Sequence, residues 1–153
     1  MQRPHDTPAL DRTPRRADTG GEEDLGVMTI RLDHTIVPSR DKAASARFFA
    51  EVLGLTVTPG RGYFAQVRVN ESLTFDFADE DGPIPSQHYA FHVSDPEFDA
   101  ILARVKARGL DYGSEPHDPR NGRLNRRRGG RGFYFEDPNG HLLELMTVPE
   151  TGS

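Results

Sequence analysis

The sequence predicts an α+β fold built from two βαβββ modules, because the same set of signals occurs twice along the chain. Each half has a histidine seven residues before a helix-capping aspartate, then a Gly-Leu pair, then one acid within the last apolar strand. In the first half these are His34, Asp41, Gly54-Leu55 and Asp76, and in the second half they are His88, Asp95, Gly109-Leu110 and Glu144. Two histidines on matching strands therefore become candidates for one metal site.

Length and composition limit the class of protein. The 153 residues suffice for one domain of ordinary size, with 35% hydrophobic and 28% charged residues. The net charge of -5 argues against nucleic-acid binding over the whole surface. The chain contains no cysteine, which excludes disulfides and thiolate metal sites. No apolar run has the length of a membrane helix and no secretory signal is visible, so we expect a cytoplasmic protein without membrane contact.

Both ends of the chain are predicted to lie outside the domain. Residues 1–27 are rich in proline and charge and predict a disordered tail, and residues 149–153 predict a loose C-terminal tail. The patterned sequence begins at Met28, which we expect to be the native start, because the codons for residues 20–23 must be purine-rich, as in a ribosome-binding site. The predicted domain then covers residues 28–148.

The first module is predicted over residues 28–78. Residues 30–37 alternate as a strand with His34 on the same face as Ile36. A helix follows, capped by Ser39 or Asp41, and ends at Gly54, a typical C′ glycine. Short strands are expected at about 55–58, 63–69 and 72–78.

A linker is predicted at 79–86, and the second module covers 87–148. His88 opens its first strand, with His92 on the same face. Asp95 is expected to cap the helix with Pro96 at its first position, and Ser94 offers a capping box in a competing register. The polar stretch 113–130 predicts a long loop, followed by a strand at 132–135, a turn at 137–140 and a last strand at 141–147. His141 is expected near the surface at the start of that strand.

Four segments together resemble the vicinal oxygen chelate superfamily, which includes glyoxalase I, bleomycin-resistance proteins, fosfomycin-resistance enzymes and extradiol dioxygenases. They are Leu32-Asp33-His34-Thr35-Ile36-Val37, the helix segment Ala46 to Leu55, His88-Tyr89-Ala90-Phe91-His92-Val93, and Phe135 to Leu145 with its Asp-Pro-Asn-Gly turn. The resemblance covers about residues 29–148. It implies a half-open curved barrel of mixed sheet, formed by the two βαβββ modules, as in the glyoxalase/bleomycin-resistance/dihydroxybiphenyl dioxygenase fold.

The resemblance also implies a metal site. His34, His88 and Glu144 fall at the metal-ligand positions of the superfamily. Two imidazoles and one carboxylate form a compact site for a divalent ion and leave positions open for water or substrate. The identity of the metal stays open among Fe, Mn, Ni, Zn and Co. Alternatively, the three side chains line a wet cavity without metal.

Four further residues are candidates around this site. Asp76 occupies the fourth ligand position by the repeat, where it acts as a ligand, as a general base, or only as a hydrogen-bond partner of the linker. His92 is a candidate for substrate contact or a place at the barrel rim. Arg126 and Arg131, in the basic run 120–131, are candidates for attracting an anionic substrate, with a solvated loop as the alternative.

Two functions follow from the resemblance. The first is a metal-dependent enzyme of the lyase, isomerase or dioxygenase type that chelates two neighbouring oxygens of a small substrate. The second is a non-catalytic protein that binds a drug or metabolite, as bleomycin-resistance proteins do. In both cases the expected partners are a small molecule and a second copy of the chain.

Overall fold

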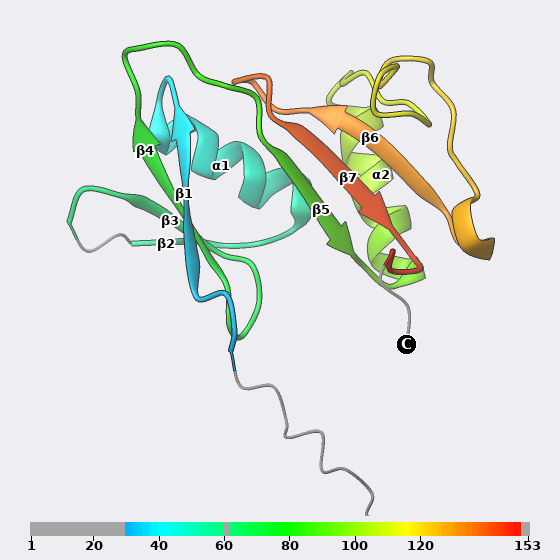
Figure 1. Ribbon diagram of the computed structural model, residues 1–153, viewed down its shortest axis with the longest axis horizontal. Helices are drawn as coiled ribbons and strands as arrows, with labels where there is room; N and C mark the ends of the chain where they lie inside the picture. The colour runs from blue at the N-terminus through cyan, green and yellow to red at the C-terminus, as the bar shows by residue number, and fades with distance from the viewer. Residues whose placement is uncertain (1–29, 60–61, 151–153) are drawn as a thin grey trace, which may run out of the picture. The chain divides into compact units, whose positions relative to one another are not determined.

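The computed structural model describes residues 30–59 and 62–150. The predicted N-terminal tail, Met28 and residues 151–153 lie outside this range. The first module consists of β1 (His34–Ser39), α1 (Lys42–Leu53), β2 (Val57–Thr58), β3 (Ala65–Arg68) and β4 (Thr74–Asp79). Its strands form one sheet in the order β1-β4-β3-β2, with β1 parallel to β4 and the other neighbours antiparallel (Figure 1).

The second module repeats this plan with one strand fewer. It contains β5 (His88–His92), α2 (Asp95–Ala107), the 3₁₀ helix η1 (Arg127–Gly129), β6 (Gly132–Glu136) and β7 (Leu142–Met146). The sheet order is β5-β7-β6, with β5 parallel to β7. Where the first module has a fourth strand, the described residues of this one form an isolated bridge between Gly113 and Tyr134. The predicted fold of two modules with mixed sheets is confirmed.

Local signals at the helix ends are satisfied by specific side chains. Asp41 caps α1 by accepting a hydrogen bond from the backbone of Ala44 at 2.9 Å, and Gly54 ends it with a φ of 75°, which glycine adopts without strain. The prediction that Asp95 caps α2 is wrong, because the helix begins one residue earlier than that prediction requires. Ser94 is the cap and forms a capping box with Glu97.

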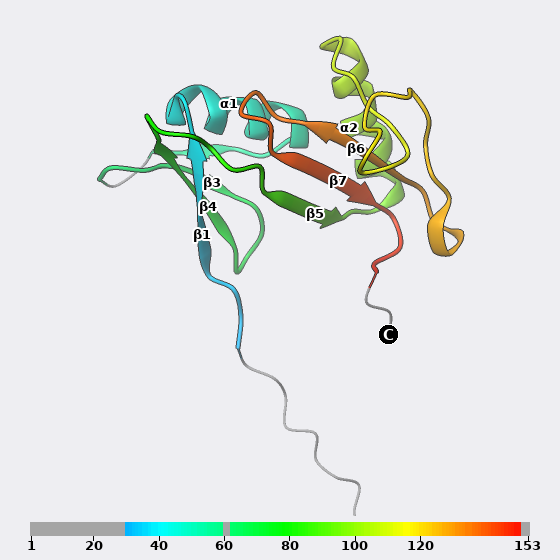
Figure 2. The ribbon, with the colours of Figure 1, turned by 45° about the horizontal axis from the view of Figure 1, so that its top comes forward.

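One face of each sheet packs against its helix, which Figures 1 and 2 show from two directions. Phe49 of α1 packs on Phe77 of β4 with ring centroids 5.0 Å apart. Phe98 of α2 packs on Phe133 of β6 at 5.2 Å. Because side chains alternate along a strand, the residues between these buried positions project from the opposite face of each sheet. That open face is where polar side chains gather.

The long loop between α2 and β6 is anchored to β6. Gly113 and Tyr134 exchange two backbone hydrogen bonds, of 2.9 and 2.8 Å. A Cβ atom on Gly113 would lie only 2.3 Å from the carbonyl oxygen of Asp118, so glycine is required for this close approach. A second bridge joins Asn125 to Gly132. The loop is therefore held against the sheet at two points.

His141 is fully buried, so its expected place near the surface is wrong. Its Nε2 lies 2.8 Å from the carbonyl oxygen of Pro38 in the first module, and its Nδ1 lies 3.1 Å from the backbone nitrogen of Gln87. The turn before it also docks on the first module, since Asn139 donates a hydrogen bond to Ser45 at 3.0 Å. Packing between the modules buries this histidine, which the sequence around it does not reveal.

Candidate metal centre

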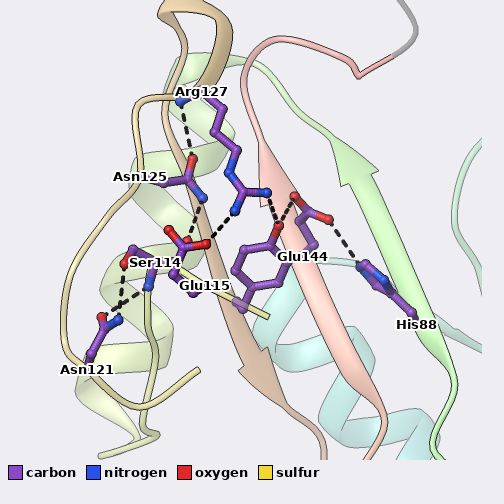
Figure 3. Close-up of polar contacts among 8 residues, drawn as sticks. His88, Ser114, Glu115, Asn121, Asn125, Arg127 and Glu144 are labelled. Carbon is purple, nitrogen blue, oxygen red and sulfur yellow. Dashed lines mark hydrogen bonds and ion pairs between the residues drawn. The ribbon is translucent and has the colours of Figure 1, made fainter. Parts of the chain in front are cut away.

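His88 and Glu144 converge on the open face of the second module. They lie on β5 and β7, which are neighbouring parallel strands, and Glu144 pairs in register with Ala90, two residues beyond His88. His88 Nε2 lies 3.1 Å from Glu144 Oε2 (Figure 3). The Glu144 side chain is 9% exposed and that of His88 is 49% exposed. A carboxylate and an imidazole are thus adjacent at a place that solvent and small molecules can reach.

Tyr134 holds the other oxygen of Glu144. It pairs in register with Glu144 on β6, is nearly fully buried, and donates a hydrogen bond from its hydroxyl to Glu144 Oε1 at 2.7 Å. Arg127 in turn donates to the Tyr134 hydroxyl at 2.9 Å. Burial and the hydrogen bond to Glu144 raise the pKa of Tyr134 well above its usual range, which keeps this hydroxyl a donor.

Tyr134 is a site residue that the sequence predictions missed, although the sequence contains a signal for it. Tyr134 lies between Phe133 and Phe135, both of which face the helix. Strict alternation along the strand therefore places the tyrosine on the opposite, open face with Glu144. No comparable signal identifies Arg127, since it lies in an irregular loop.

The first module carries a matching set of residues. Asp76 on β4 pairs in register with Ile36 of β1 and with Gln66 of β3, so these side chains share the open face with His34. Gln66 donates a hydrogen bond to Asp76 Oδ1 at 2.8 Å. That bond connects Asp76 to its own sheet, rather than to the linker.

His34 is held by its neighbour in sequence. Its Nδ1 lies 2.8 Å from a carboxylate oxygen of Asp33. This hydrogen bond raises the pKa of His34. The side chain is 59% exposed and lies on β1, which is an edge strand of its sheet.

Within one copy of the protein, two of the three predicted metal ligands lie close together. His88 and Glu144 are adjacent, whereas His34 lies on the other sheet. Over residues 30–59 and 62–150, no three histidine, aspartate or glutamate side chains form a cluster that could hold a metal ion. Within the same residues, no helix has the length and apolar character to cross a membrane.

The predicted substrate residues have different surroundings. His92 lies on the face of His88 and is exposed, and Arg126 is exposed in the loop before η1. Arg131 is engaged on the helix side, where it pairs with Asp95 and Asp99 of α2 at 2.6 Å each. His92 and Arg126 are therefore accessible, whereas Arg131 forms ion pairs with α2.

A cavity of about 610 Å³ adjoins His88. Its walls are mostly apolar or aromatic, with a few polar side chains on the rim. They include Leu53, Leu73, Phe75, Phe91 and Ile101, together with His88, His92 and Glu97. Tyr89 also lines it, and burial raises the pKa of its hydroxyl to about 12. The volume falls in the range that binds small organic molecules.

Comparison with known proteins gives one family and several relatives. The family model of the Glyoxalase/Bleomycin resistance protein/Dioxygenase superfamily matches residues 31–145. A curated relative, the glutathione transferase FosA of Serratia marcescens, is 28% identical over 120 residues, which are 74% of this chain and 78% of that protein.

Two solved structures are more similar in sequence. Oxidase ChaP-H2 is 49% identical with a TM-score of 0.79, and the match covers 82% of this chain and 98% of that one. Oxidase ChaP-H1 is 46% identical with a TM-score of 0.77, over 80% of this chain and 99% of that one. Both likenesses therefore extend over most of this chain and nearly all of the other.

Proposed function

We propose that this chain, which belongs to the Glyoxalase/Bleomycin resistance protein/Dioxygenase superfamily, is a metal-dependent oxidase of a small organic molecule. The observation that carries the proposal is the convergence of His88 and Glu144 on an accessible face of the second module. The similarity to two oxidases favours oxidase chemistry over the other reactions of the superfamily.

The geometry of His88 and Glu144 fits a divalent ion. Two ligands bound at right angles to one ion, with bonds of ~2.0–2.2 Å, lie about 3 Å apart. His88 Nε2 and Glu144 Oε2 are 3.1 Å apart. With His34 as the third ligand, the set contains two histidines and one carboxylate, which is typical of non-haem Fe(II) oxygenases. Fe(II) held by these residues would supply electrons for the activation of dioxygen.

The third ligand comes from a second copy in this proposal. β1 and β5 are edge strands of their sheets, and β1 exposes the apolar Ile36 beside His34. The half-site on each sheet is incomplete among the described residues. A homodimer that places β1 of one copy beside β5 of the other brings His34 to His88 and Glu144. Each dimer then contains two equivalent sites.

In the reaction that we propose, the substrate loses two electrons and two protons, and dioxygen accepts both to leave as hydrogen peroxide. In this proposal the substrate binds in the mostly apolar cavity beside His88. We assign to Asp76 the role of the base that accepts a substrate proton, because it lies on the open face of its sheet and its described hydrogen bond, from Gln66, engages only Oδ1.

Nitric oxide, which mimics dioxygen, tests the site without knowledge of the substrate. Protein loaded anaerobically with Fe(II) and exposed to nitric oxide is expected to give the electron paramagnetic resonance signal of a high-spin iron–nitrosyl centre. His88→Ala is expected to lose the signal, while His117→Ala, in an exposed loop, retains it. A wild-type protein without this signal would contradict the proposal.

A heterodimer of two variants tests the shared site. His34→Ala and His88→Ala each remove one ligand from every site of a homodimer. In a heterodimer of the two, shared sites leave one site with all its ligands, so metal uptake returns to about half of the wild-type value. Sites formed within one chain predict no recovery, and that result would overturn the shared arrangement.

Thiol transfer is the alternative that the similarity to a glutathione transferase suggests. It predicts loss of free glutathione when the Mn(II)-loaded protein is incubated with fosfomycin. The oxidase proposal predicts no such loss.

A further inference from the structure

Tyr134 and Arg127 form a one-directional chain of hydrogen bonds that ends on Glu144. Arginine carries only donors, so the 2.9 Å contact from Arg127 Nη1 must be accepted by the Tyr134 oxygen. The Tyr134 hydroxyl therefore donates its own proton to Glu144, whose Oε1 lies 2.7 Å away. The direction of both bonds follows from the chemistry of the guanidinium group.

The loop that carries Arg127 fixes it in this position. Glu115 accepts a hydrogen bond from Arg127 Nη2 at 2.6 Å, so both ends of the guanidinium are engaged (Figure 3). Asn125 donates to the carbonyl of Ser114 at 3.1 Å and so ties the two sides of the loop together. Figure 3 shows Arg127 reaching from the loop toward Glu144.

The hydrogen bonds from Arg127 to Tyr134 and from Tyr134 to Glu144 leave one oxygen of Glu144 for a metal ion. Oε1 accepts from the tyrosine, and Oε2 faces His88 Nε2 at 3.1 Å. A carboxylate that is nearly buried and held at one oxygen cannot rotate without losing that bond. The bond is strong because the acceptor is charged.

Among the described residues, the first module lacks an equivalent restraint. Gln66 occupies the place of Tyr134 and donates to Asp76 at 2.8 Å. A glutamine amide carries both donors and an acceptor, and the described contacts of Gln66 include no arginine to fix its direction. The two acids therefore differ, and Glu144 is the one held in a single orientation by a directed chain.

We propose that Tyr134 and Arg127 are positioning residues that present Glu144 to the metal through a single oxygen. This inference rests on the proposed function, because it assumes that Glu144 binds a metal ion. Its consequence is an additional open position on the ion, since a one-oxygen carboxylate occupies one coordination site and a two-oxygen carboxylate occupies two.

Metal affinity of substituted proteins tests this role. Tyr134→Phe removes only the hydroxyl, and loss of such a partner of a metal ligand typically weakens metal binding by ~10–100-fold. We expect Mn(II) to bind Tyr134→Phe within that range of weakening, measured by calorimetry. Arg127→Ala is expected to weaken binding less, and to add little in the Tyr134→Phe background, because Arg127 acts through the tyrosine.

Two matched controls exclude general effects of substitution. Tyr112→Phe removes a tyrosine hydroxyl from the same module, and Arg123→Ala removes an exposed arginine from the same loop. Both are expected to keep the wild-type affinity. The visible spectrum of the Co(II)-loaded protein, which reports coordination number, should change in Tyr134→Phe and remain unchanged in both controls.

The outcomes separate this inference from the proposed function. If the wild-type protein binds metal and Tyr134→Phe has the same affinity and the same Co(II) spectrum, the positioning role alone is overturned. A wild-type protein that binds no divalent metal would overturn the proposed function, and the positioning role with it.

Discussion

At the scale of a single residue, His141 helps to join the two modules. The ring accepts a hydrogen bond from the backbone of Gln87 through Nδ1, so Nε2 carries the proton that is donated to the carbonyl of Pro38. Both ring nitrogens of a fully buried side chain are therefore used, in one neutral tautomer. One bond reaches β1 and the other reaches the residue before β5.

Replacing His141 with phenylalanine keeps a ring but leaves the part-buried carbonyl of Pro38 and amide of Gln87 without these partners. A buried group without a partner costs ~1–3 kcal/mol, and a part-buried group lies toward the lower end of that range. We expect the free energy of unfolding to fall by about 2–4 kcal/mol in urea denaturation at neutral pH. His117→Phe is the control, since His117 is exposed and its substitution should change stability by less than ~0.5 kcal/mol. Equal effects of the two variants would contradict the joining role.

At the scale of an element, the start of α2 depends on Ser94 and Glu97. Glu97 accepts hydrogen bonds from the backbone of Ser94 at 2.9 Å and from its hydroxyl at 2.7 Å. These bonds, to the hydroxyl first and the backbone second, lower the pKa of Glu97 from its ordinary 4.5. A lowered pKa means that the stabilisation is present above the ordinary value and is lost as pH falls through the lowered one.

Ser94→Ala is expected to destabilise the protein by ~1 kcal/mol at neutral pH, as for other N-cap serines. The penalty should shrink in acid below the lowered pKa of Glu97, because the protonated acid no longer binds Ser94 in the wild type. Thermal unfolding at neutral and acid pH measures both effects. A Ser94→Ala variant as stable as the wild type at neutral pH would contradict the capping role of Ser94.

At the scale of the whole molecule, metal binding and stability are linked. A ligand that binds only the folded protein stabilises it by about 2.7 kcal/mol when present at 100 times its dissociation constant. We expect Mn(II) at 100 times its dissociation constant to raise the free energy of unfolding by about 2.7 kcal/mol per site. A chelator should reverse this rise. His88→Ala should lose the effect, whereas His117→Ala should keep it.

The order of elements could be predicted from sequence because it depends on local signals. The cap at Asp41, the glycine at 54 and the strand alternation around His88 are all read from neighbours in the chain. His141 could not be placed this way, since its partner Pro38 is 103 residues distant and meets it only through packing of the modules. Likewise, alternation placed His34 on the same face of its strand as Ile36, but the sequence does not show which other strand approaches that face.

The close contact at Gly113 has a consequence for anyone who redesigns the long loop. The atoms nearest to an added Cβ belong to the backbone of residues 118–120, at 2.3 to 2.8 Å, so no change of rotamer relieves the clash. A library that varies the whole loop should return glycine alone at 113, while the exposed positions 116 and 117 accept many sequences. Sequence changes in this loop are therefore best made at positions 116 and 117, with position 113 left untouched.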